Sequence, residues 1–242
     1  IGVSLSYKIG SACYIPISHI NNEAITQLKL DFIISLLNPI LSDNSILKIG
    51  QNIKYDLIVL KKNGFNFIYP CDDTMLMSYS LSAGLHHHNL DFLAKFYLDH
   101  QMIKFKDIVG TGKKEINFSE VDIEIAKNYA CEDADITLRL WHALKKNLIQ
   151  KKILRVYENI EKPLINVIVN MEMNGIKIKE DKLNLLSKSF DSQMHLLQNE
   201  IFSITNKEFN INSPKQLGEI LFNELNLPGG KKNKSGGFST NS

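Results

Sequence analysis

Two short clusters of acidic, amide and aromatic residues hold the side chains best suited to hydrolytic chemistry. The first, QNIKYD at residues 51–56, ends at Asp56, and the second runs from Tyr129 to Asp133. On a helix, Tyr129 and Asp133 would share one face, because residues four apart are neighbours. Mg²⁺ prefers carboxylate and phosphate oxygens. Phosphodiester hydrolysis with two metal ions needs such carboxylates and a group that orients the attacking water, which a tyrosine hydroxyl can do.

The residue types alone leave other interpretations open. An aspartate in the first turn of a helix is also favoured as a solvated acid by the positive end of the helix dipole. Tyr129 and Asp133 could equally form a surface pair. Three consecutive histidines at positions 86–88 invite a metal-site interpretation. Neighbouring residues point in different directions, however, so we interpret the histidines as a polar loop.

The elements that must position these residues follow an α/β pattern as far as residue 150. Asn52 is a plausible N-cap for the helix that carries Asp56, and Gly64 a plausible stop. Asp72 and Asp73 are suited to cap the helix that follows them. The pattern predicts strands at 1–7, 13–17, 46–49 and 67–69, and helices at 23–38, 52–62, 74–81, 90–98, 119–128 and 129–150.

Beyond residue 150 the pattern is almost entirely helical, which predicts two domains, 1–150 and 151–242. A short strand is expected at 176–179, and Ser213 with Pro214 should start another helix. Apolar residues at steps of three and four mark one helix face in this part: Leu183, Leu186, Phe190, Met194, Leu197 and Ile201.

Composition sets broad limits on function. The chain has 242 residues and a net charge of only +2, so any nucleic-acid binding must depend on local patches. Charged residues interrupt every apolar run well short of the ~20 residues that span a bilayer, so we expect no membrane partner. The three cysteines match no zinc or disulfide spacing and are interpreted as reduced thiols of a cytoplasmic protein. The chain begins at Ile1 in a strand-like run, which we interpret as the start of a fragment.

Two motifs and several shorter segments carry a resemblance that runs along the whole chain. The motifs are KIGQNIKYD at residues 48–56 and YACEDAD at residues 129–135, and the segments are 73–81, 158–164, 172–178, 209–217 and the lysine-rich tail. In this order they resemble family A DNA polymerases, with the two motifs similar to the second and third exonuclease motifs. The resemblance implies an α/β, ribonuclease-H-like 3′–5′ exonuclease domain that lacks its first strand, followed by an all-α segment that begins the polymerase thumb.

The resemblance implies roles for individual residues. Asp56 and Asp133 would be ligands of a two-metal Mg²⁺ site, where Mn²⁺ or Zn²⁺ is also conceivable, and Tyr129 would position the nucleophilic water. Phe105 would stack on substrate bases, a contact that tolerates any sequence, although its type alone also suits a core position. The remaining expected DNA contacts are Gln51, Asn52 and Tyr55 at the single-stranded primer end, His87 where the family often has arginine, and Lys231, Lys232 and Lys234 near duplex phosphates. The lysines could instead merely aid solubility.

The sequence also departs from the family pattern. We expect the Asp-x-Glu strand of the first motif upstream of Ile1, and the polymerase palm and fingers beyond Ser242. The chain alone would then be neither a polymerase nor a competent exonuclease. The parent would be a monomeric, bacterial, cytoplasmic enzyme of DNA replication and repair that has both activities. Two other interpretations remain open: a free-standing DEDD-type 3′–5′ exoribonuclease, and a catalytically dead DNA-binding module.

Overall fold

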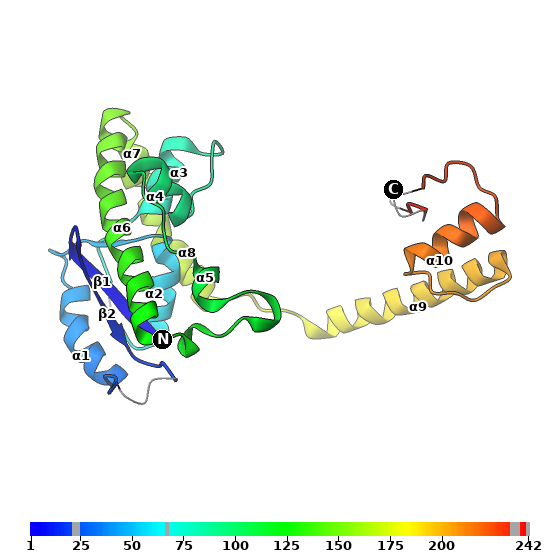
Figure 1. The fold of residues 1–242 in the computed structure, drawn as a ribbon, viewed down its shortest axis with the longest axis horizontal. Helices are drawn as coiled ribbons and strands as arrows, with labels where there is room; N and C mark the ends of the chain where they lie inside the picture. The colour runs from blue at the N-terminus through cyan, green and yellow to red at the C-terminus, as the bar shows by residue number, and fades with distance from the viewer. Residues whose placement is uncertain (21–24, 66–67, 233–237, 241–242) are drawn as a thin grey trace. The chain divides into compact units, whose positions relative to one another are not determined.

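The computed structural model describes residues 1–20, 25–65, 68–232 and 238–240 of the chain (Figure 1). These residues form two compact units, Ile1–Gly175 and Ile176–Ser242. The expected domain border at residue 150 therefore falls inside the first unit, because the helices after residue 150 pack into it.

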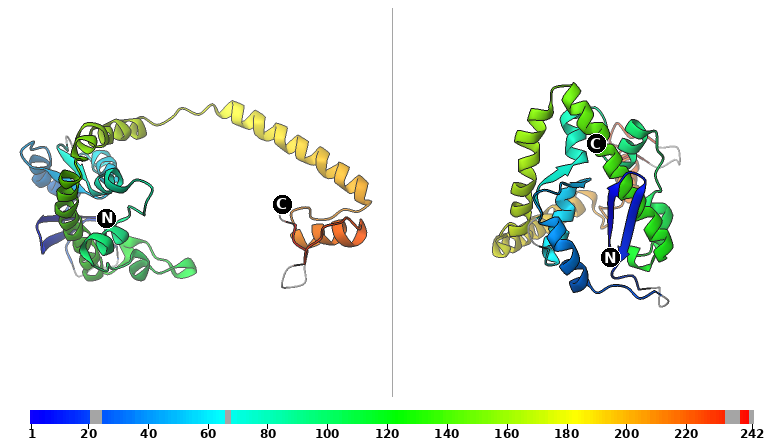
Figure 2. Two further views of the ribbon diagram at one scale, coloured as in Figure 1. Left: turned by 90° about the horizontal axis from the view of Figure 1, so that it is seen from above. Right: turned by 90° about the vertical axis from the view of Figure 1, so that its left-hand side faces the viewer.

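An antiparallel hairpin opens the first unit. Strands β1 (Gly2–Lys8) and β2 (Ser11–Pro16) pair from Gly2 opposite Pro16 to Lys8 opposite Ser11, which confirms both predicted strands. Gly10 takes the turn at φ +78°, a conformation that favours glycine. The hairpin lies along helix α6 (Ile123–Gln150), as Figures 1 and 2 show.

A second, parallel pair of strands carries the acidic segment. Strands β3 (Lys48–Gly50) and β4 (Cys71–Asp73) are joined through helix α2 (Ile53–Lys62), and helix α3 (Thr74–Ser82) follows directly. The strand predicted at 67–69 was misplaced, since Ile68 and Tyr69 lie outside any strand and Phe67 lies outside the described residues. Residues 71–73 form the strand instead, because they are the ones that pair with β3. As predicted, Asp73 caps α3, with its side chain accepting hydrogen bonds from the Met75 and Leu76 amides.

Three further segments surround these strands. Helix α1 (Leu30–Leu41) begins later than the predicted 23–38, and residues 21–24 of that prediction lie outside the described residues. Helix α4 (Leu90–Leu98) matches its prediction and is capped by Asn89. A loop segment then holds α5 (Phe105–Val109) and two 3₁₀ turns, η1 (Gly112–Lys114) and η2 (Phe118–Glu120).

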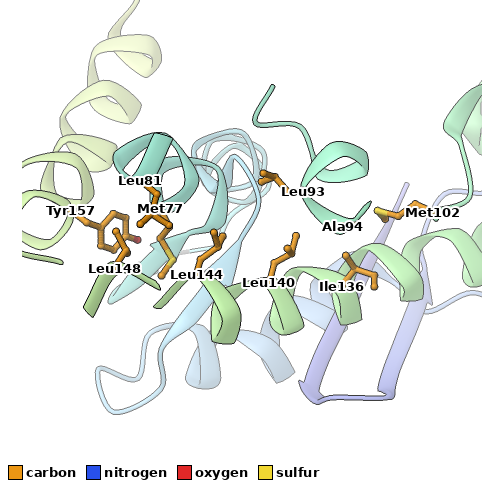
Figure 3. Packing of buried hydrophobic residues seen from close by; sticks show 10 residues of the cluster. All are labelled: Met77, Leu81, Leu93, Ala94, Met102, Ile136, Leu140, Leu144, Leu148 and Tyr157. Atoms are coloured by element: carbon orange, nitrogen blue, oxygen red, sulfur yellow. The ribbon is translucent and has the colours of Figure 1, made fainter. Parts of the chain in front are cut away.

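Helix α6 is one continuous helix of 28 residues, where we predicted two helices that met at residue 129. Its real start is the Asp122 cap, which accepts hydrogen bonds from the Glu124 and Ile125 amides. One stripe of α6 is fully buried against α3 and α4 (Figure 3). The members of this core are Met77, Leu81, Leu93, Ala94, Met102, Ile136, Leu140, Leu144, Leu148 and Tyr157.

The segment after α6 completes the first unit. It contains α7 (Leu154–Val156), the π-helical turn η3 (Tyr157–Glu161) and α8 (Lys162–Asn174). Tyr157 is fully buried in the α6 core, while Ile165 and Val169 of α8 join a second core with Ile33 and Leu57.

The second unit is helical. Helix α9 (Glu180–Thr205) spans 26 residues, and α10 (Pro214–Glu219) is capped by Ser213 as predicted and runs into the turn η4 (Ile220–Glu224). Residues 176–179 form no strand, so that prediction was wrong: β-branched residues without a pairing partner do not make a strand. Of the helices in the described ranges, none has both the length and the apolar composition that crossing a bilayer would require.

Candidate active site

A cleft of about 1310 Å³ in the first unit gathers the residues of both acidic–aromatic clusters. It is lined by residues of β1, β2 and β3 and by parts of α1, α2, α4 and α6. Asp56, Tyr129 and Asp133 all line it, although more than 70 residues separate Asp56 from the other two. The fold therefore brings the predicted catalytic residues to one surface.

The turn between β3 and α2 sets the position of Asp56. Gly50 ends the strand so close to the next helix that a Cβ atom there would lie 2.7 Å from Ile53 Cγ1. Asn52 then adopts a left-handed conformation at φ 56° and makes no side-chain cap, so the predicted N-cap role of its side chain is not observed. Asp56 follows in the first turn of α2, and its side chain is exposed to the cleft.

Helix α6 supplies the other two residues from a stripe next to its buried one. The Tyr129 hydroxyl and the Asp133 carboxylate, one turn later, lie close enough to affect each other's pKa. Thr137, another turn along, is buried and also lines the cleft. The four-residue spacing seen in the sequence thus produces a hydroxyl–carboxylate pair on one helix face.

Burial raises the pKa of both cleft carboxyl groups. The pKa of Asp133 rises to about 7, mainly through burial and with help from the negative charges of Glu132 and Asp91, while the neighbouring Tyr129 hydroxyl opposes the rise. The pKa of Asp56 rises to about 6 through burial and the charge of Asp73. Because Asp56 is open to the cleft, solvent screens part of its shift. Burial and the Asp133 charge together raise the pKa of Tyr129, so the phenol stays protonated at neutral pH.

The donor set suits a hard divalent cation. Two carboxylates that lose stability when ionised in a cleft would be stabilised by a bound positive charge. Mg²⁺ typically uses one or two carboxylates, with water and substrate phosphate as its other ligands. Across the described parts of the chain, no three histidine, cysteine or acidic side chains gather closely enough to hold a metal ion. The fit is therefore to a cation that keeps open positions.

The side chains expected to contact DNA in the first cluster differ in how available they are to a ligand. Tyr55 lines the cleft and is 67% exposed, so its ring is available to a ligand. The Gln51 side chain is already used within the protein: its amide nitrogen donates to the His88 carbonyl at 2.8 Å, and its oxygen accepts from Thr74 Oγ1 at 2.5 Å. Asn52 marks the left-handed turn before α2.

Two phenylalanine rings lie close to the Tyr129 ring. Phe105, which is 48% exposed, has its ring centroid 5.9 Å from that of Tyr129. Phe118 stacks on Phe105 at 6.0 Å and approaches Tyr129 at 6.1 Å. The sequence analysis missed Phe118, because an aromatic residue in a loop segment gives no periodic signal.

Glu132 is a second residue whose role the sequence did not reveal. Its carboxylate pairs with His100 Nε2 at 2.8 Å and accepts the Ile103 amide at 2.7 Å. These contacts hold the loop that leads to Phe105. Its place within the second cluster was the one available signal.

The remaining predicted contacts lie outside the cleft lining. His87 is exposed and packs edge-on to Phe92 at 6.4 Å. Its neighbours are held in the loop, with His88 Nδ1 bonded to Ser78 Oγ at 2.9 Å and His86 stacked on Phe92 at 5.0 Å. In the second unit, Lys231 and Lys232 are exposed, and Lys234 lies outside the described residues.

Comparison with known proteins identifies two matched regions. Residues 1–149 match the family model described as 3′–5′ exonuclease, and residues 180–242 match the model described as DNA polymerase family A. Residues 150–179, which include α7, η3 and α8, lie between the two matched regions.

Curated relatives cover nearly the whole chain. DNA polymerase I of Rhizobium leguminosarum is 41% identical over 95% of this chain and 23% of its own length. DNA polymerase I of Pseudomonas aeruginosa is 39% identical over 99% of this chain and 27% of its own length. The chain therefore spans about a quarter of the length of these relatives.

Solved structures agree in fold. The structure titled "POL domain of Pol1 from M. smegmatis complex with DNA primer-template and dNTP" is 25% identical, has a TM-score of 0.62, and covers 96% of this chain and 35% of its own. Brucella melitensis NrnC has a TM-score of 0.55 over 72% of this chain and 76% of its own. At 20% identity the second match shows the fold alone. The predicted fold class, an α/β exonuclease domain followed by a helical segment, is confirmed.

Proposed function

Since the chain belongs to the 3′–5′ exonuclease family, we propose that its first unit supplies the proofreading nuclease site of a DNA polymerase. The observation that carries the proposal is the shared cleft of Asp56, Tyr129 and Asp133, in which both carboxyl pKa values are raised. The proposed substrate is the single-stranded 3′ end of a DNA primer, and the proposed reaction is hydrolysis of its last phosphodiester bond.

Each residue has a distinct task in this reaction. Asp56 and Asp133 would hold Mg²⁺, or Mn²⁺ in its place, and the metal when bound would supply positive charge for the phosphate and the attacking water. The Tyr129 hydroxyl stays protonated, so it can orient a water molecule by hydrogen bonding. Asp133 lies one turn further along α6, so the hydroxyl and this carboxylate would act from the same face of the helix.

The aromatic residues would bind the primer end. Phe105 and Tyr55 present exposed rings, and a base can stack on either face whatever its identity. The ring of Phe118 stacks on that of Phe105 and would hold it in place. A sequence-independent grip of this kind suits an enzyme that must remove any mispaired nucleotide.

The cleft also has room for a further strand. In the described part of the chain, β1 pairs only with β2 and β3 only with β4, so each strand has an unpaired edge, and both strands line the cleft. We propose that an extended segment with the Asp-x-Glu motif pairs there and completes the set of metal ligands. Unpaired backbone groups favour such pairing.

For the second unit we propose a role in holding duplex DNA. Its match to the polymerase family and its exposed Lys231 and Lys232 support this assignment. Each phosphate that a lysine neutralises adds salt-dependent affinity. The nucleotidyl transfer reaction itself would belong to other parts of the parent polymerase, acting in DNA replication and repair.

The proposal is tested on the gene product that contains this chain. With Mg²⁺, a 5′-labelled single-stranded DNA should be shortened from its 3′ end, and Asp56→Asn, Asp133→Asn and Tyr129→Phe should each slow this shortening while leaving primer extension intact. Chelation of the metal should stop both reactions. Faster shortening of RNA than DNA would favour an exoribonuclease instead, and DNA binding without any cleavage would favour a catalytically dead module.

A further inference from the structure

The Asp73 carboxylate joins the starts of two helices. It lies at the end of β4 and is 1% exposed. Its Oδ1 atom accepts the Asn52 amide at 3.0 Å and the Met75 amide at 2.8 Å, and its Oδ2 atom accepts the Ile53 amide at 3.0 Å. One side chain therefore caps both α3, which follows it, and α2, which begins 20 residues earlier.

Helix α2 depends on this distant cap. The Asn52 side chain, which stands at the usual capping position, makes no cap hydrogen bond. The first amides of a helix have no partner within the helix and need one from outside. Asp73 supplies that partner for Asn52 and Ile53.

Neighbouring contacts strengthen the same junction. Thr74 Oγ1 donates to Gln51 Oε1 at 2.5 Å and lies 3.1 Å from the Gly50 carbonyl oxygen. Tyr157, fully buried, accepts the Asp73 amide at its hydroxyl at 2.9 Å and donates that hydroxyl to Asp72 at 3.1 Å. The end of β4 is thus fixed from two sides.

Asp56 lies only three residues beyond Ile53, in the first turn of α2. A shift of the helix start would therefore move the Asp56 carboxylate relative to Tyr129 and Asp133 on α6. We propose that Asp73 is a positioning residue of the nuclease site, which sets the place of Asp56 by capping α2, and that Tyr157 holds Asp73 for this task. The inference rests on the proposed metal-ligand role of Asp56.

Asp73→Asn provides a sharp test, because the change is almost isosteric. The amide oxygen can keep the bonds of Oδ1, but the amide NH₂ would face the Ile53 N–H, which is also a donor. Asp91→Asn is the matched control. It removes one negative charge beside the cleft, from an exposed residue of α4 that makes no hydrogen bond to α2 among the described residues.

The variants are compared in the gene product by three measurements: Mn²⁺ titration followed by electron paramagnetic resonance, hydrogen exchange of the Asn52 and Ile53 amides, and 3′ shortening of single-stranded DNA. For Asp73→Asn we expect faster exchange at both amides and a Kd for Mn²⁺ that rises about 10–100-fold, as for other residues that orient metal ligands. Tyr157→Phe should show the same changes to a smaller extent. Asp91→Asn should leave the exchange unchanged and the Kd within about 3-fold.

Several results would overturn the inference. Wild-type Mn²⁺ affinity in Asp73→Asn despite faster exchange would show that the cap does not place Asp56. Equal losses of Mn²⁺ affinity in Asp73→Asn and Asp91→Asn would mean that the effect comes from the lost negative charge and not from the lost cap. If Asp73→Asn does not fold, wild-type behaviour of Tyr157→Phe in all three measurements would count against it. A wild-type protein without Mn²⁺ binding or nuclease activity would instead refute the proposed function, and this inference with it.

Discussion

The two longest helices, α6 and α9, have similar sequence patterns but opposite environments. They span 28 and 26 residues, and each repeats apolar residues at steps of three and four. Both helices lie wholly within the described residues. Eight residues of α6 are buried, whereas no residue of α9 is buried. The β1–β2 hairpin covers one side of α6, and α3 and α4 another. Periodicity therefore predicts which side chains share a face, while other segments decide whether that face is covered.

The largest expected contrast between the helices is in catalysis. Asp133→Asn on α6 should lower the rate of 3′ shortening of single-stranded DNA at least about 100-fold, because loss of the proposed metal ligand should exceed the effect of losing a residue that merely orients one. Asp191→Asn on α9 removes the same charge from an exposed position and should leave this rate unchanged. Nuclease assays of both variants, with primer extension as a folding control, check the contrast. Equal losses would contradict it.

Stability should show the next largest contrast. Leu144→Ala, at a position with 0% exposure on α6, should reduce the free energy of unfolding by about 3 kcal/mol, through lost burial and a residual cavity. Leu186→Ala, at 49% exposure on α9, should change it by less than about 0.5 kcal/mol. Urea titrations of the gene product measure both. A large loss for Leu186→Ala would reveal that another part of the protein covers α9.

The cleft stripe of α6 should behave differently from its buried stripe when pH changes. The folded pKa of Asp133 is about 7, above the ~3.9 of an unfolded aspartate, so the folded state binds more protons between these values. The stability contributed by the protonated Asp133 carboxyl is therefore complete below about pH 4 and declines as pH rises towards 7. Without metal we expect a decline of roughly 1–2 kcal/mol, after allowance for solvent in the cleft.

Thermal unfolding at several pH values tests this expectation. Asp133→Asn should flatten the decline, and Mg²⁺ should restore stability most strongly above pH 7, where the carboxylates are ionised. A wild-type profile that stays flat in a metal chelator would argue against a destabilised carboxylate in the cleft.

The smallest expected effects concern the exposed faces, where the two helices should become alike. Glu124→Gln breaks the surface ion pair with Lys127 on α6, and His195→Gln breaks the pair with Asp191 on α9. Each should change the free energy of unfolding by less than about 0.5 kcal/mol, because exposed pairs gain little in water. Salt-dependent melts of the two variants provide the measurement. A change above 1 kcal/mol in either would mean that its pair belongs to a larger network.

Local signals in the sequence predicted many elements of the fold. The β1–β2 hairpin, the helices α2 and α4, and the caps at Asp73 and Ser213 were all visible as local patterns. The errors occurred where distant partners decide. Strand β4 lies where β3 can pair with it, and residues 176–179 form no strand because no partner is present in the described residues.

The sequence pointed to the acids of the candidate site but not to the residues that support them. The residue types left Asp56, Tyr129 and Asp133 open to other interpretations, and the resemblance to family A polymerases supplied their predicted roles, which stay predictions. Nothing in the sequence indicated that Asp73 would cap a helix 20 residues upstream, or that Phe118 would stack on Phe105. Both contacts join residues that are far apart in the sequence, and a local sequence pattern carries no information on such pairs.

The buried ion cluster around Asp72 has a consequence for how such genes can be recombined. Asp72 accepts Trp141 Nε1 at 2.7 Å and pairs with Lys162 Nζ at 2.7 Å, and Tyr157 bonds to it as well. A chimera joined at residue 150 would take Tyr157 and Lys162 from another parent protein. The buried Asp72 carboxylate would then depend on residues of that parent, and a mismatch would strongly destabilise the fold. Gly175, exposed and at φ +69°, is the safer crossover point for exchanging nuclease modules between polymerases.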